Sequence, residues 1–210
     1  MFVVATSVSY KDIVDHYENC YKQHGDSHLG VDWPDKTDAD TRYRIMTEGV
    51  EYCSGNSILD FGCGLAHYYE YLVKQDKNYY YEGLELSKPM FDRCIQKHPL
   101  TTFYNTDILQ EEWTLPKLDC AVMNGVFTEK LTLSHDEMFE HMTKLVSLVF
   151  NNVNKGIMFN VMSKQVDYER DDLFHLSVDK LSWFVKEQLS RKFVIRHDYD
   201  LWDYTVYILK

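Results

Sequence analysis

The chain has 210 residues, of which 45% are hydrophobic and 26% are charged, and its formal net charge at pH 7 is −11. This length and composition are typical of a soluble globular protein with one domain, or with one domain and an appendage. The acidic charge argues against nucleic-acid binding, which depends on clustered Lys and Arg. Because no apolar run approaches the length of a membrane-spanning helix, we expect no membrane association.

The five cysteines are scattered along the chain and never form a Cys-x-x-Cys pair. They are Cys20, Cys53, Cys63, Cys94 and Cys120. This set favours a reducing compartment and argues against a disulfide framework or a zinc site. The apolar stretch Phe2-Val3-Val4-Ala5 is too short for a signal peptide and has no basic leader. We therefore expect a cytoplasmic protein.

The first 50 residues are polar and rich in aromatic side chains. Apolar spacing predicts an amphipathic helix over Tyr10–Tyr21 and a second helix from Asp38 to Val50. Glycine and proline between them predict a loop from His24 to Pro34. Because this region is too polar to form its own core, we expect residues 1–50 to form a helical lid over a main domain at 51–210.

From Ser57 onward, strand-like and helix-like segments alternate. The predicted strands are Ser57–Phe61, Tyr79–Leu84, Thr101–Tyr104, Leu118–Met123, Gly156–Val161, Phe193–His197 and Thr205–Leu209. The predicted helices are Leu65–Gln75, a helix that begins after Ser87 as its N-cap, Asp136–Phe150 and Val178–Leu189. This order predicts an α/β fold with a doubly wound, mostly parallel sheet. The last two strands leave no room for a helical crossover, so they should form an antiparallel C-terminal edge.

Ligands of such sheets bind beyond the carboxyl ends of the strands. After the first strand, the Gly-x-Gly corner at residues 62–64 lets the backbone approach a ligand closely. After the second strand, Glu85 can accept hydrogen bonds from both hydroxyls of a ribose. Asp107 suits an adenine amino group, with Ile108 against the ring, and Asn124 ends the fourth strand. Together these positions predict a site for a nucleoside cofactor.

Residues 57–210 resemble the class I S-adenosylmethionine (SAM)-dependent methyltransferases. Leu59-Asp60-Phe61-Gly62-Cys63-Gly64 is similar to the glycine motif of that family, Glu85 to its ribose acid and Asp107 to its adenine-side acid. The resemblance implies SAM as cofactor and a Rossmann-like sheet of seven strands. It implies these cofactor-binding residues: Asp60, Gly62, Cys63, Gly64, Glu85, Leu86, Asp107, Ile108 and Asn124. The chain departs from the family pattern at Ala66, where many members have a third glycine. His67 stands where a nicotinamide dehydrogenase would carry glycine, which disfavours that class.

Further motifs resemble a subgroup associated with glycan and surface-polysaccharide biosynthesis. They are His24-Gly25, Val31-Asp32-Trp33, Arg42-Tyr43, Phe159-Asn160 and His197-Asp198-Tyr199. The implied acceptor is a sugar or glycan hydroxyl, and another small molecule is the alternative. We expect the Arg42 guanidinium to pair with the cofactor carboxylate, although a surface arginine is an equal alternative.

Methyl transfer to a hydroxyl benefits from a base, whereas a neutral amine can attack unaided. We predict His135 as this base, with Glu129 next, and with His24, Asp167 and His175 as further candidates. No His and carboxylate cluster has metal-ligand spacing, so no metal is predicted, although the acids at 167, 171 and 172 could chelate a hard cation. Nucleic-acid or protein methylation and a non-catalytic cofactor-binding role remain as alternatives. The segment after the fourth strand, Asn124-Gly125-Val126-Phe127, lacks the prolines expected of an N6-adenine enzyme.

Overall fold

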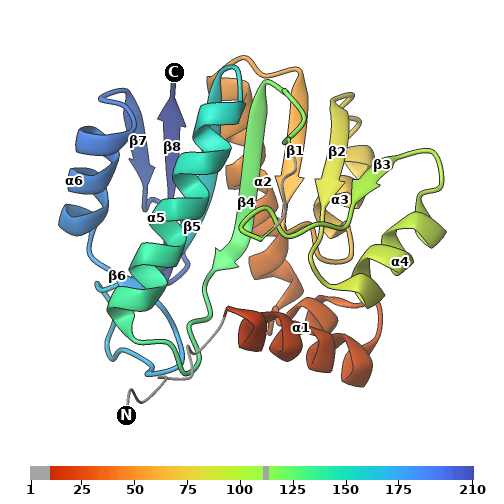
Figure 1. Cartoon of the computed structure of the whole chain (residues 1–210), viewed down its shortest axis with the longest axis horizontal. Coiled ribbons are helices and arrows are strands. Elements are labelled where there is room, and N and C mark those ends of the chain that lie inside the picture. The colour runs from red at the N-terminus through yellow and green to blue at the C-terminus, as the bar shows by residue number, and fades with distance from the viewer. Residues whose placement is uncertain (1–9, 111–113) are drawn as a thin grey trace, which may run out of the picture.

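The computed structural model describes residues 10–110 and 114–210, which form one mixed sheet flanked by helices (Figure 1). The strands are β1 Ser57–Phe61, β2 Tyr80–Leu84, β3 Thr102–Tyr104, β4 Cys120–Phe127, β5 Gly156–Ser163, β6 His175–Leu176, β7 Phe193–Arg196 and β8 Asp203–Leu209. Their order along the sheet is β3-β2-β1-β4-β5-β8-β7. The first five strands pair in parallel, and β8 runs antiparallel to both β5 and β7. The predicted fold class, including its antiparallel C-terminal edge, is confirmed.

Two features of the sheet differ from the prediction. β6 is an eighth strand of only two residues, which pairs in parallel with β5, and so short a segment carries no sequence pattern. β4 continues past its predicted end at Met123 to Phe127, with a shift of its register against β5 in between. Asn124 therefore lies within an irregular strand and not after its end.

The helices form layers on both faces of the sheet (Figure 1). They are α1 Lys11–His24, α2 Lys36–Tyr52, α3 His67–Lys74, α4 Lys88–Lys97, α5 His135–Asn152 and α6 Val178–Gln188, with a short 3₁₀ helix, η1 His28–Val31. α5 and α6 pack in one hydrophobic cluster, and α2 and α3 pack in another. Ser87 caps α4, as predicted. Ser134 caps α5 in a capping box with Glu137. Within the described residues, every helix is too short or too polar to cross a bilayer.

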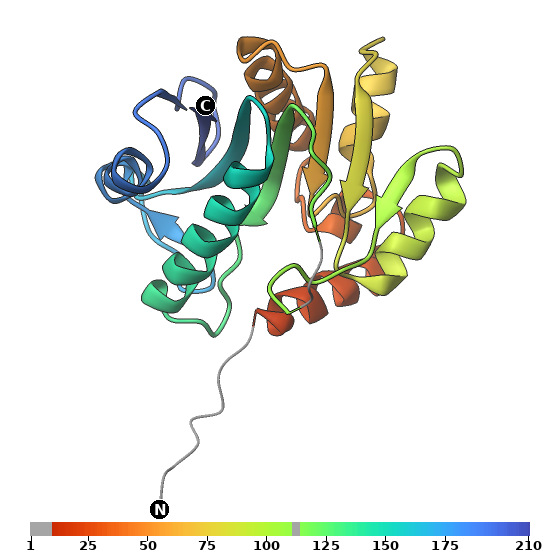
Figure 2. The same ribbon diagram turned by 45° about the horizontal axis from the view of Figure 1, so that its top comes forward.

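The N-terminal region divides into two parts. In α2, Ile45, Met46 and Val50 are fully buried and belong to the same hydrophobic cluster as Ile58 of β1. This helix is therefore a layer of the main domain. α1 instead lies across the carboxyl ends of the strands (Figure 2). Of the predicted lid at residues 1–50, only α1 and the segment up to η1 lie over the strand ends. Residues 1–9 lie outside the described residues.

Candidate functional site

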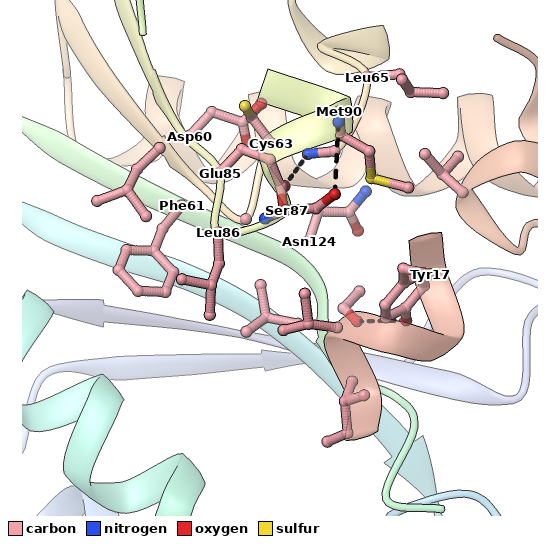
Figure 3. Close-up of a pocket in the computed structure, with 18 of the residues that line it drawn as sticks. Tyr17, Asp60, Phe61, Cys63, Leu65, Glu85, Leu86, Ser87, Met90 and Asn124 are labelled. Atoms are coloured by element: carbon pink, nitrogen blue, oxygen red, sulfur yellow. Dashed lines mark hydrogen bonds between the residues drawn. The ribbon is translucent and has the colours of Figure 1, made fainter. Parts of the chain in front are cut away.

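A cavity opens at the carboxyl ends of β1, β2 and β4, and α1 forms its opposite wall (Figure 3). It encloses about 1180 Å³ when the space open to solvent is counted. Its walls contain nine of the ten residues predicted to bind the cofactor: Asp60, Gly62, Cys63, Gly64, Glu85, Leu86, Asp107, Ile108 and Asn124. The structure thus brings together residues that lie up to 64 positions apart (from 60 to 124) in the sequence.

The turn after β1 approaches the cavity through backbone in the left-handed region. Gly62 and Gly64 have φ angles of 72° and 56°, which disfavour any side chain there. A Cβ added to Gly62 would lie 2.9 Å from Val126, so the turn also packs tightly against β4. Ala66, at the position of the family's third glycine, has a φ of 60° and is likewise left-handed.

The carboxylate of Glu85 is held between two backbone N–H groups at the end of β2. Gly64 donates to Oε2 at 2.7 Å and Ser87 donates to Oε1 at 2.8 Å. Burial raises the pKa of Glu85 to about 7, although both of these hydrogen bonds favour the ionised form. The carboxylate is thus oriented at the cavity wall before any ligand binds.

Two further acids line the cavity from β1 and from the segment after β3. Asp60 accepts a hydrogen bond from the hydroxyl of Tyr81 at 2.6 Å, and burial raises the pKa of Asp60 to about 7. Asp107 accepts from the hydroxyl of Tyr10 at 2.5 Å and from the backbone N–H of Leu109 at 3.0 Å. Asp107 therefore also joins the start of α1 to the sheet domain.

Asn124 contributes an unpaired acceptor to the cavity. Its Oδ1 is buried and has no hydrogen-bond partner among the described residues. The neighbouring Gly125, with a φ of 78°, donates its N–H to Oδ1 of Asn160 at 2.8 Å. An unsatisfied buried amide oxygen is costly to folding, so this atom is expected to receive a donor from a ligand.

The structure corrects the prediction for Arg42. Its guanidinium lies outside the cavity walls, where it pairs with the buried carboxylate of Asp203 at 2.8 Å and lies 4.4 Å from the ring centroid of Trp33. The sequence could not reveal this partner, because Asp203 lies 161 residues further along the chain. Both predicted alternatives, a cofactor ligand and a surface arginine, differ from this buried pair.

The two leading candidates for the base have different surroundings. His135 does not line the cavity, and its Nε2 donates to the backbone oxygen of His175 at 3.0 Å. Glu129 is also absent from the cavity walls. It is buried, with 7% of its surface exposed, and its carboxylate makes no hydrogen bond or ion pair with any described residue. Burial first, and then the charge of Asp32, raise the pKa of Glu129 to about 7. The charge of Glu129 in turn helps to raise the pKa of Tyr17, which lines the cavity.

The remaining base candidates do not line the cavity either. Both ring nitrogens of His175 are engaged, with the oxygen of Ser163 at 2.6 Å and with the N–H of Arg170 at 3.1 Å. His24 and Asp167 are exposed and absent from the cavity walls.

Sequence reasoning missed several lining residues, because they come from helices and from segments beside them that reach the cavity only in the folded chain. They are Tyr10, Tyr17, Trp33, Met90 and His141. Of these, only Trp33 lay within a motif noted in the sequence. Burial lowers the pKa of His141 to about 4, so this imidazole is neutral at pH 7.

Comparison with known proteins adds one relative in sequence. No protein-family model matches the chain. The "Putative methyltransferase Rv1506c" of Mycobacterium tuberculosis is 24% identical over 156 residues, which cover 73% of this chain and 93% of that protein.

Three solved structures that are similar to this chain carry the name methyltransferase. Magnesium protoporphyrin IX methyltransferase from Synechocystis, with bound SAM, has a TM-score of 0.63 at 14% identity and covers 99% of this chain and 100% of its own. A SAM-dependent methyltransferase of Leishmania major has a TM-score of 0.64 at 18% identity and covers 96% of this chain and 82% of its own. The plantazolicin methyltransferase BpumL, in complex with a pentazolic desmethylPZN analogue and S-adenosylhomocysteine (SAH), has a TM-score of 0.61 at 13% identity and covers 95% of this chain and 97% of its own. The chain therefore has the fold of the class I SAM-dependent methyltransferases.

Proposed function

We propose that the protein is a SAM-dependent methyltransferase. The observation that carries this proposal is the Glu85 carboxylate, fixed by the N–H groups of Gly64 and Ser87 at the wall of the cavity. A carboxylate in this position suits the two vicinal hydroxyls of a ribose. The buried, unpaired oxygen of Asn124 and the turn at Gly62 and Gly64, which a Cβ would strain, also fit such a ligand. The SAM-bound neighbours of the same fold support the choice of cofactor.

Each of the nine predicted residues that line the cavity then has a proposed role toward SAM. Glu85 accepts the ribose hydroxyls, and Asp107 accepts the adenine amino group. Leu86 and Ile108 pack against the adenine ring, and the turn at residues 62–64 follows the methionine part of the cofactor. Asp60 and the Oδ1 of Asn124 accept from its amino group or from bound water. Arg42 is left out, because its guanidinium is already paired with Asp203.

SAM supplies a methyl group on a sulfonium, which an acceptor atom attacks in line. The protein needs to align the acceptor, exclude water and remove a proton. Tyr17 and Trp33 close the cavity from the N-terminal side and border the end of β4. The hydroxyl of Tyr17 donates to the backbone oxygen of Gly125 at 3.4 Å, and Trp33 packs against the same glycine.

We infer a hydroxyl acceptor on a sugar or glycan, with Glu129 as the base. The motifs shared with the glycan-associated subgroup support the sugar. The burial of Glu129, its lack of a hydrogen-bond partner among the described residues and its pKa of about 7 support the base. Methyltransferases of this fold include enzymes named for a porphyrin and for a plantazolicin peptide. Another small-molecule or peptide acceptor is therefore the main alternative.

Two proposals concern the whole protein. α1, joined to the domain by the Tyr10–Asp107 hydrogen bond, is proposed as a lid that admits the acceptor. A cytoplasmic location is supported by the five cysteines, which are all free thiols.

The test is a methyl-transfer assay with isotopically labelled SAM against nucleotide sugars, glycans, small amines and peptides, followed by a crystal structure with SAH. We expect label in a sugar product and the ribose hydroxyls on Glu85. Label only in amines or peptides would contradict the sugar but keep the methyltransferase. SAH bound elsewhere, or no binding, would overturn the proposal as a whole.

A further inference from the structure

We propose that His16, Cys20 and Asp32 bind a transition-metal ion of the zinc class beside the cofactor cavity. This inference does not depend on the proposed methyl transfer. Within the described residues, these three form the one group of His, Cys, Asp and Glu side chains whose ligand atoms all lie within 4.8 Å of one another. The sequence predicted no metal site, because Asp32 joins the other two only through the turn after η1.

The geometry is close to that of a metal site. His16 and Cys20 are four residues apart on α1, so their side chains lie on the same face of the helix. His16 Nε2 lies 2.8 Å from Oδ2 of Asp32 and 3.8 Å from Sγ of Cys20. Ligands bound to one tetrahedral zinc ion at about 2.0–2.3 Å stand roughly 3–4 Å from each other. Small side-chain movements would therefore bring all three onto one ion.

The surroundings of the three residues favour a cation. Glu129 is a second acid nearby, 7% exposed and without a hydrogen bond or ion pair among the described residues. The basic side chains that influence the charge of Glu129 are those of His16 and Arg170. Neither of them forms an ion pair with it. A divalent ion would balance the two carboxylates and stabilise the thiolate.

Metal binding would change the protonation of these groups. Nε2 of His16 now carries the hydrogen donated to Asp32, and it would give its lone pair to the metal instead. Cys20 would lose its thiol proton, so binding releases protons to solvent. The ion would join α1 to the segment before Trp33, and both line the cavity through Tyr17 and Trp33. The metal is thus expected to hold two walls of the cavity together.

The test uses the full chain, freed of metal with a chelator and titrated with Co²⁺ and then with Zn²⁺. Thiolate-to-cobalt charge-transfer absorption at one equivalent, displaced by Zn²⁺, is the expected result. Cys20→Ser should abolish this absorption. His16→Ala should weaken cobalt binding by more than about tenfold. Removal of a residue that only contacts a metal ligand already costs about that much, and His16 is proposed as a ligand itself. Cys53→Ser and His24→Ala, which change residues outside the cluster, are the matched controls and should bind as the wild type does.

Three results would overturn the site. These are no absorption in the wild type, an unchanged titration of Cys20→Ser, and loss of binding in Cys53→Ser instead. If Cys20→Ser fails to fold, alkylation of the wild-type protein replaces it. Zinc should then slow the modification of Cys20, identified by peptide mass spectrometry, more than that of the half-buried Cys53. Equal rates at Cys20 with and without zinc would contradict the proposal.

Discussion

The guanidinium of Arg42 binds both carboxylate oxygens of Asp203, with Nη2–Oδ1 at 2.8 Å and Nε–Oδ2 at 3.2 Å. Asp203 is 1% exposed, and its Oδ2 also accepts from Nδ2 of Asn160 at 2.7 Å. Asn160 in turn holds the N–H of Gly125. A chain of buried polar contacts therefore runs from α2 through β8 and β5 to the turn of β4 at the cavity.

The first prediction concerns the stability of this chain of contacts. Asp203→Asn should lower the free energy of unfolding by about 3–5 kcal/mol, because it leaves the Arg42 charge buried without its counter-ion. Arg44→Ala, which breaks an exposed pair with Glu48 on the same helix, should lower it by no more than about 1 kcal/mol. Chemical denaturation measures both. Equal losses, or lost SAM affinity with unchanged stability, would contradict this structural role for the Arg42–Asp203 pair.

The second prediction concerns Ala66, whose φ of 60° is unfavourable for a residue with a Cβ. Left-handed backbone costs about 1–2 kcal/mol for such a residue, whereas glycine adds about 0.4–1 kcal/mol of entropy to the unfolded chain. Ala66→Gly should therefore leave stability unchanged or raise it by up to about 1.6 kcal/mol. Ala39→Gly, inside α2, should lower stability by about 1 kcal/mol or more. The account fails if thermal unfolding shows the same loss for both.

The third prediction concerns pH. The pKa values of Asp60 and Glu85 are raised to about 7 in the folded protein by burial, above the values near 4 that they have in an unfolded chain. Between these values the native state binds more protons, so the stability of the ligand-free protein falls as pH rises from about 4 to 7. Asp60→Asn should reduce this fall, as unfolding curves across pH can show. SAM affinity should rise as Glu85 ionises, through pH 7, and an affinity that falls over this range would argue against the ribose contact.

The fourth prediction separates the two candidates for the base. Glu129→Gln should lower turnover on the true acceptor by roughly 10²–10⁴ with little change in SAM affinity, because only proton removal is lost. His135→Ala should leave turnover almost unchanged, since the Nε2 of this histidine is already bonded to the backbone oxygen of His175. Steady-state kinetics on both variants decide between them. Loss of turnover in His135→Ala alone would reverse the assignment.

The sequence was sufficient for seven of the eight strands because each of the seven has a local signal, which the two-residue β6 lacks. Most predicted strand bounds agree with the observed ones within one or two residues. Buried strands appear in the sequence as apolar runs that end at glycine or at polar turns. β4 is the exception, because its bulge between Met123 and Phe127 depends on β5 beside it. The side chains at strand ends were also predictable, because parallel strands bring their carboxyl ends to one edge.

Residues that act through distant partners could not be predicted from the sequence. Arg42 appears in the sequence as a possible anion ligand, and only the folded chain brings it to Asp203. His135 follows β4 closely in sequence, yet it begins α5 and its ring turns to the backbone of His175. Tyr17 and His141 carry no motif and reach the cavity only through the packing of α1 and α5.

The central claim is that Glu85 holds the ribose of SAM, and isothermal titration with SAM and SAH on three proteins tests it most directly. Glu85→Gln should weaken binding by roughly ten- to a hundredfold, the value of a buried charge-assisted hydrogen-bond acceptor. Glu82→Gln is the matched control, because Glu82 is buried on β2, the strand that Glu85 follows, but bonds to Tyr80 and Tyr104 outside the cavity. The account predicts wild-type affinity for Glu82→Gln and a large loss for Glu85→Gln. Unchanged affinity in a folded Glu85→Gln protein, or no binding by the wild type, would contradict it.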